Sequence, residues 1–249
     1  MNIFSAYQSR FEAAKEDEFS LQEYLELCKT DRSAYATASE RMLMAIGEPE
    51  LVDTRLDPRL SRIFSNKVLK LYPAFRDFYG MEEVIENIVS YFRHASQGLE
   101  EKKQILYLLG PVGGGKSSLA EKLKTLIEHV PFYAIKGSPV RESPLGLFNA
   151  GEDGPILEDD FGIPRRYLNT IMSPWAVKRL LEFNGDITKF RVVKLRPSVL
   201  QQIAVAKTEP GDENNQDISS LVGKITPTNA LSAGAVVPPA LKFWKSSAL

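Results

Sequence analysis

The sequence predicts an α/β fold in which helices flank a parallel sheet, preceded by a helical amino-terminal region. Residues 105–109 (ILYLL) are an apolar run that leads into a glycine-rich loop. An amphipathic segment and a second apolar run, PFYAIKG at 131–137, follow it, and FRVVKL at 190–195 is a third run of the same kind. The order strand, glycine loop, helix, strand opens a doubly wound unit, whose strands are parallel.

Helical patterns fill the region before this unit, which we place at residues 1–75. Ser20 and Glu23 form a capping box, and the apolar residues that follow within 21–28 share one helix face. A second helical pattern ends at Gly47 and Pro49, and a third covers 81–95. Residues 54–75 are irregular and suit either a loop with a short helix or an extended connector.

The remaining elements follow from the same patterns. Residues 105–109 suit a buried parallel strand, because they are apolar and bounded by polar residues and by Gly-Pro. We expect helices at 117–128 and at 173–183, the start of another at 195–207, and a long loop at 137–160.

Composition excludes several functional classes. The chain has 249 residues, 43% hydrophobic and 25% charged, with a net charge of −1. This balance gives no excess of basic residues of the kind that accompanies broad binding to nucleic acids or anionic membranes. Because the chain also has no 18-residue apolar run and no secretory signal pattern, we expect a cytoplasmic protein without membrane partners. The single cysteine, Cys28, cannot form an internal disulfide and is expected to be a small buried residue.

The glycine-rich loop matches the pattern G-x-x-x-x-G-K-[ST] at every fixed position. The match consists of Gly110, Pro111, Val112, Gly113, Gly114, Gly115, Lys116 and Ser117, and we add Ser118 to the expected binding residues. The glycines allow backbone N–H groups to converge on phosphate, Lys116 is suited to the β and γ phosphates, and Ser117 to Mg²⁺. The loop therefore predicts a nucleotide site for ATP and Mg²⁺, with a plain glycine turn as the alternative.

A segment upstream of the loop resembles AAA+ ATPases, in which a short stretch ending in glycine packs against the adenine. Here this stretch is DFYG, residues 77–80, followed by Met81. The resemblance implies that Tyr79 and Gly80 lie at the base, with Tyr79 and Met81 as an apolar wall. The alternative is a simple helix start.

Longer stretches resemble the amino-terminal AAA domain of PrkA-type bacterial serine protein kinases. They are GPVGGGKSSLAEKLK, ESPLGLFNAGEDGPILEDDFGIPRRYLNTIMSPWAVKRLLEF and GDITKFRVVKL, then QQIAVAKTEPGDENNQDISSLVGK. The resemblance covers residues 1–223 and makes 76–223 an incomplete AAA-type P-loop domain. It implies ATP binding, phosphoryl transfer to a protein serine, a protein substrate and a role in stress or starvation, and it leaves a homo-oligomer open.

Several features depart from a complete kinase. No apolar strand ends in Asp-Glu, and the nearest match is ILEDD at 156–160. The motif H-R-D is absent, and the letters D-F-G at residues 160–162 occur without it, so no catalytic residue is assigned. Arg165 and Arg166 are expected to be an ordinary surface or structural pair rather than arginine fingers. Residues 224–249 contain none of the 32 acidic residues, and we interpret them as a divergent tail left by truncation.

The sequence thus favours ATP binding as part of a PrkA-like serine protein kinase. The main alternative is a truncated, non-catalytic module that binds nucleotide or partners. A small-metabolite kinase of the P-loop class ranks below both, because the long resemblance points elsewhere.

Overall fold

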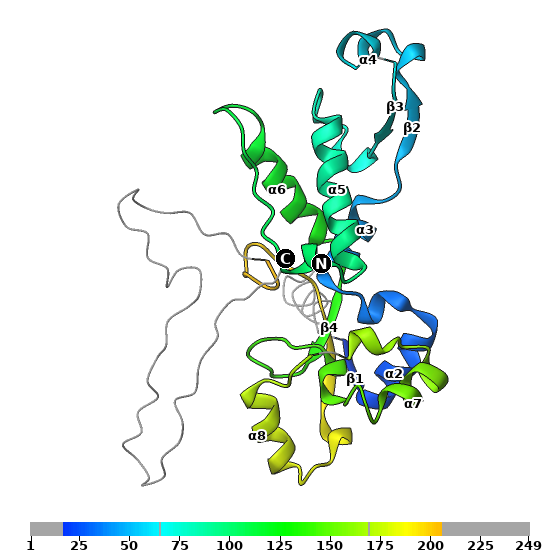
Figure 1. The fold of residues 1–249 in the computed structure, drawn as a ribbon. Coiled ribbons are helices and arrows are strands. Elements are labelled where there is room, and N and C mark those ends of the chain that lie inside the picture. The colour runs from blue at the N-terminus through cyan, green and yellow to red at the C-terminus, as the bar shows by residue number, and fades with distance from the viewer. Residues whose placement is uncertain (1–16, 65, 169, 206–249) are drawn as a thin grey trace, which may run out of the picture. The chain divides into compact units, whose positions relative to one another are not determined.

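The computed structural model describes residues 17–64, 66–168 and 170–205, which belong to two compact units (Figure 1). In the described ranges, the sheet unit comprises residues 17–35 and 131–195, and the loop unit comprises residues 36–130 and 196–205. The domain boundaries that we expect at residues 75 and 223 stay predictions. No helix within the described ranges combines the length and apolar character that a membrane crossing needs.

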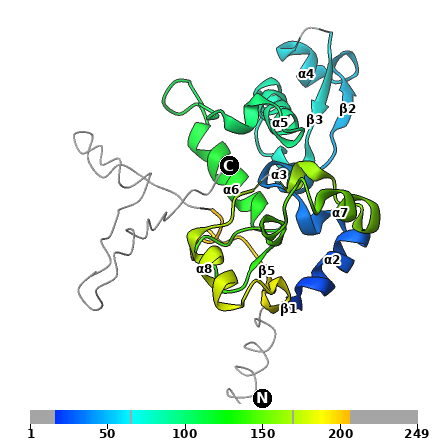
Figure 2. The same ribbon diagram turned by 60° about the horizontal axis from the view of Figure 1, so that its bottom comes forward.

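Within its described residues, the sheet unit has one antiparallel sheet of three strands in the order β1-β5-β4. The strands are β1 (Asp17–Ser20), β4 (Phe132–Ile135) and β5 (Arg191–Leu195). The helices of this unit are α2 (Leu21–Thr30), α7 (Gly154–Phe161) and α8 (Pro174–Glu182). Helix α7 lies beside α2 (Figures 1 and 2). The core of the unit lies between one face of the sheet and these two helices.

Helix α2 begins at the predicted capping box. The Ser20 hydroxyl accepts a hydrogen bond from the Glu23 N–H at 3.1 Å, and the Glu23 carboxylate accepts one from the Ser20 N–H at 2.6 Å. Tyr24 is fully buried, and its hydroxyl donates to the Ala34 carbonyl oxygen at 3.3 Å. Cys28 is buried in the same core, as expected, and this burial raises the pKa of its thiol to about 12.

Helices form the core of the loop unit. They are α3 (Ala38–Ile46), α5 (Glu82–Ser96) and α6 (Lys116–Ile127), and α3 packs against both others. A hairpin of β2 (Glu50–Asp53) and β3 (Val68–Leu71) carries the short helix α4 (Pro58–Ile63) between its strands. The apolar faces of α5 and α6 meet in one cluster through Ile88, Phe92, Leu119 and Leu123. This cluster fixes the helix that follows the glycine-rich loop.

The predicted parallel sheet is not what the structure shows. The second and third predicted strands, β4 and β5, pair antiparallel with each other, and β1 adds to β5 in the same sense. The first predicted strand, residues 105–109, belongs to no strand in the described part of the chain. The expectation failed because an apolar run indicates burial but not strand direction, which depends on how the intervening chain returns.

Residues 105–109 nevertheless alternate as a strand does. Leu106 and Leu108 are partly buried against the α5–α6 cluster, whereas Ile105, Tyr107 and Leu109 are 90%, 79% and 84% exposed. Their backbone groups make no hydrogen bond within the described residues. The segment thus has an exposed apolar face and two open edges, the form of a strand without neighbours.

Of the other predicted elements, three helices are confirmed and two predictions are wrong. Helices α5, α6 and α8 confirm the helices expected at 81–95, 117–128 and 173–183. The loop expected at 137–160 holds most of α7, and the helix start expected at 195–207 consists, up to residue 205, of turns and an isolated bridge. The divergent tail expected at residues 224–249 lies outside the described residues.

Candidate nucleotide site

The glycine-rich loop has a backbone that most residues cannot adopt. Gly113 and Gly115 have φ angles of +79° and +77°, in the left-handed region where side chains cause strain. Gly114 is restricted in another way, because a Cβ there would lie 3.1 Å from the Pro111 carbonyl oxygen. Three successive glycines are therefore explained by geometry alone.

The loop ends at the amino terminus of α6, where backbone donors are open. Helix α6 begins after Gly115, and no side chain among the described residues caps it. The N–H groups of Gly113, Gly115, Lys116, Ser117 and Ser118 donate to no group in the described part of the chain. Such groups carry the positive end of the helix dipole, so together they are suited to an anion.

Lys116 adds a full positive charge to these donors. Its Nζ donates to the carbonyl oxygens of Gly110 at 2.7 Å and Pro111 at 2.5 Å. Because both partners are neutral, these two hydrogen bonds leave the positive charge of the lysine uncancelled. Ser117 and Ser118 are exposed on the first turn of α6, beside the lysine. The structure therefore brings together the loop residues that the motif predicts.

The turn that contains Tyr79 and Gly80 lies against the loop. The contact is made by Met81, since a Cβ built on Gly115 would lie 3.1 Å from the Met81 sulfur. The Tyr79 side chain is 73% exposed, so its ring is available to a ligand. The two residues expected at the base are thus next to the residues expected at the phosphates.

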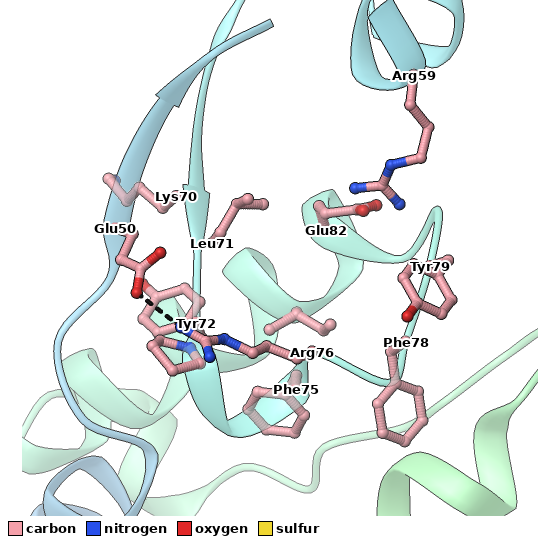
Figure 3. Close-up of a pocket in the computed structure, with 12 residues that line it drawn as sticks. Glu50, Arg59, Lys70, Leu71, Tyr72, Phe75, Arg76, Phe78, Tyr79 and Glu82 are labelled. Carbon is pink, nitrogen blue, oxygen red and sulfur yellow. Dashed lines mark hydrogen bonds and ion pairs between the residues drawn. The ribbon is translucent and has the colours of Figure 1, made fainter. Parts of the chain in front are cut away.

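A hollow of about 290 Å³ opens between this turn and the β2–β3 hairpin (Figure 3). Phe78 and Tyr79 line it, and the Arg59 guanidinium, from α4, lies 5.3 Å from the centre of the Tyr79 ring. Glu82, the first residue of α5, is only 8% exposed, and its Oε2 has no hydrogen-bond partner within the described residues. In Figure 3 the Glu82 carboxylate points to the side of the hollow where Arg59 and Tyr79 lie.

The acidic and arginine pairs considered for catalysis lie in the sheet unit. Residues 156–160 belong to α7, and Glu158 accepts a hydrogen bond from Arg165 Nε at 3.1 Å. Arg166 donates to the Tyr167 hydroxyl at 2.8 Å. Both arginines are thus in local structural contacts, as expected. In the described ranges, no group of three or more His, Cys, Asp and Glu side chains is placed to hold a metal ion.

Arg59 and Glu82, which line the hollow, were not predicted from the sequence. An acidic residue in the first turn of a helix is usually explained by the helix dipole, so Glu82 carried no signal of its own. Helix α4 did have a signal, because Asp57 and Pro58 are a favourable helix start. The Asp57 carboxylate accepts hydrogen bonds from the N–H groups of Arg59 and Leu60 at 2.8 and 3.1 Å.

The structure is thus a mixed α/β protein whose glycine-rich loop ends at an open helix terminus beside a lysine. The PrkA AAA domain family matches residues 19–230, and the chain therefore belongs to this family. The family expected from the sequence is confirmed.

Two curated relatives extend this comparison. The chain is 69% identical over 229 residues to "Serine/threonine kinase YeaG" of Escherichia coli (strain K12), a match covering 90% of this chain and 36% of that protein. It is 33% identical over 220 residues to "ATP-dependent protease PrkA" of Bacillus subtilis (strain 168), covering 84% of this chain and 32% of that protein. The chain spans about a third of the length of these relatives. No solved structure matches it significantly.

Proposed function

We propose that this chain binds ATP with Mg²⁺ through residues 110–118, as part of a PrkA-like serine protein kinase. The observation that carries the proposal is the set of open N–H groups at residue 113 and residues 115–118. They lie in the loop and on the first turn of α6, and Lys116 adds its charge there. A chain of phosphates offers the many anionic oxygen atoms that such a group of donors requires.

The proposed roles follow from the geometry of the loop. Lys116 Nζ exchanges the carbonyl oxygens of Gly110 and Pro111 for phosphate oxygens. Ser117 contributes its hydroxyl to Mg²⁺, which neutralises phosphate charge and usually keeps several waters besides its phosphate ligands. Tyr79 and Gly80 lie alongside the base, as the AAA+ resemblance implies.

We also propose that residues 105–109 are the strand that leads into the loop, within a parallel sheet of the P-loop type. Their alternating burial and their unpaired backbone groups support this proposal. Strands added at both edges would satisfy those backbone groups, and a helix packed on the open face would cover Ile105, Tyr107 and Leu109.

The kinase activity has weaker support than ATP binding. The name of the Bacillus relative states ATP dependence, whereas the name of the Escherichia relative states a serine/threonine kinase. ATP binding fits both names, but transfer to a protein serine fits one. The protein substrate, the stress-response role and the cytoplasmic location stay predictions, and the non-catalytic module stays the alternative.

The test is a calorimetric titration with Mg-ATP, in which phosphate release and transfer to protein are followed in the same samples. We expect binding that is lost in Lys116→Ala and kept in Lys124→Ala. Lys124 is a matched control because it lies on the same helix and pairs with Glu121 at 2.7 Å. Lys116-dependent transfer supports the kinase, and binding without turnover supports the non-catalytic module. Absence of binding by the unmodified chain would overturn the proposal.

A further inference from the structure

We infer that α4 of one copy of this chain binds α7 of a second copy, through two helix faces of opposite charge. Each face consists of three exposed residues at positions i, i+3 and i+4 of its helix, which lie on one side of a helix. The basic face of α4 is Arg59, Arg62 and Ile63, and the acidic face of α7 is Ile156, Asp159 and Asp160.

The basic face lies at the end of the β2–β3 hairpin, where α4 is held by Leu60 (Figure 1). Leu60 is fully buried, whereas Ile63 is 55% exposed. Arg59 and Arg62 form no ion pair within the described residues. The Arg59 guanidinium lies 5.3 Å from the centre of the Tyr79 ring, a contact that leaves its N–H groups able to donate to a carboxylate. The face therefore presents two uncompensated cations beside an apolar side chain.

The acidic face repeats this arrangement with the opposite charge. Leu157 is 3% exposed and holds α7 in the core of its unit, whereas Ile156 is 58% exposed. Asp159 and Asp160 form no ion pair in the described part of the chain, although their neighbour Glu158 does. Both aspartates lie in the last turn of α7, where the negative end of the helix dipole disfavours carboxylates. Cations from another molecule would offset this cost.

The two faces match when the helices pair antiparallel. Ile63 then lies opposite Ile156, and Arg59 lies opposite Asp160, because both spacings are four residues, or about 6 Å along a helix. The remaining arginine and aspartate lie between these contacts, about 3 Å apart along the axis, which an arginine side chain spans. Parallel pairing would instead place each isoleucine opposite a charged residue. The pattern thus favours one orientation as well as one partner.

The contact is heterologous, because the basic and acidic faces are different surfaces. Two copies that exchange both contacts form a dimer, and copies that share one contact each form a ring or an open chain. The net charge of −1 imposes little repulsion between copies. Because the two helices are short and their faces exposed, each contact is weak and depends on ionic strength. It involves neither the glycine-rich loop nor Lys116, so its test is independent of ATP binding.

The experiment is sedimentation velocity of the whole chain at low salt, with two charge-reversal variants. Arg59→Glu combined with Arg62→Glu makes the face of α4 acidic. Asp159→Arg combined with Asp160→Arg makes the face of α7 basic. Each variant alone brings like charges together, so its association constant should fall at least about tenfold. An equal mixture of the two should associate again, because the acidic α4 of one variant meets the basic α7 of the other.

A control variant separates this contact from a general effect of charge. Arg93→Glu combined with Lys102→Glu changes the net charge as the α4 variant does, at exposed residues outside both faces. It should associate as the unmodified chain does, and thermal melting checks that every variant is folded. Raising the salt from about 0.05 M to about 0.5 M should weaken association of the unmodified chain. Reversal variants that associate normally, a mixture that stays unassociated, or an unmodified chain that does not associate would each overturn the inference.

Discussion

Replacing the loop glycines by alanine, one at a time, should distinguish the positions whose backbone conformation disfavours a side chain from the position that accepts one. Gly113→Ala places a side chain at φ +79°, where the left-handed conformation costs about 1–2 kcal/mol. Because the bound loop must keep this backbone, Mg-ATP affinity should fall about 5- to 30-fold. Gly115→Ala should lose at least as much, since its φ is +77° and the new Cβ would also lie 3.1 Å from the Met81 sulfur.

Gly110→Ala is the internal control of this series. Its φ is not in the left-handed region, and its Cβ would meet Lys116 Cδ at 3.7 Å, an ordinary contact. We therefore expect Mg-ATP affinity within about twofold of the unmodified chain. Calorimetric titration measures all three variants, and thermal melting checks that each is folded. Equal losses in Gly110→Ala and Gly113→Ala, or no loss in any variant, would refute the reasoning from backbone conformation.

Three further predictions concern stability and association. Leu119→Ala removes a side chain of α6 that is 1% exposed, so urea unfolding should show that the free energy of unfolding falls by about 2–5 kcal/mol. The exposed Thr125→Ala should change it little. A loss below about 1 kcal/mol for Leu119→Ala would contradict the packing. Burial raises the pKa of Cys28 to about 12, above the value of about 8.5 in an unfolded chain, so its contribution to stability is complete below about pH 8.5 and is lost as the pH rises toward 12. The native thiol should accordingly resist a disulfide reagent at about pH 8 and react after unfolding, and a fall in stability above about pH 8.5 that is unchanged in Cys28→Val would exclude Cys28 as its cause. Tyr107→Lys puts a charge on the open apolar face of residues 105–109 and should reduce self-association in sedimentation; unchanged association would show that another surface drives it.

The helices of this chain could be predicted because their signals are local. The Ser20–Glu23 capping box and the apolar spacing of 81–95 and 117–128 are contained within single elements, and the structure confirms all three helices. The glycine-rich loop could be predicted equally well, because the residues that shape it are consecutive.

The sheets could not be predicted in the same way. The pairing of β1 with β5 joins residues 17–20 to residues 191–194. No local sequence pattern indicates that segments so far apart in the sequence pair, or that they pair antiparallel. The β2–β3 hairpin could not be predicted for another reason, because a whole helix, α4, separates its strands. Glu82 shows the limit for side-chain environments, because its burial, and the lack of a partner for its Oε2 within the described residues, are evident only in the folded chain.

Amide hydrogen exchange of the loop tests the central claim most directly. The N–H groups of Gly113 and residues 115–118 have no acceptor within the described residues, so they should exchange rapidly in the chain alone. Saturating Mg-ATP should slow exchange at these amides in the unmodified chain and leave them fast in Lys116→Ala. Binding of ATP that protects other amides and leaves these unchanged would place the phosphates elsewhere and contradict the account.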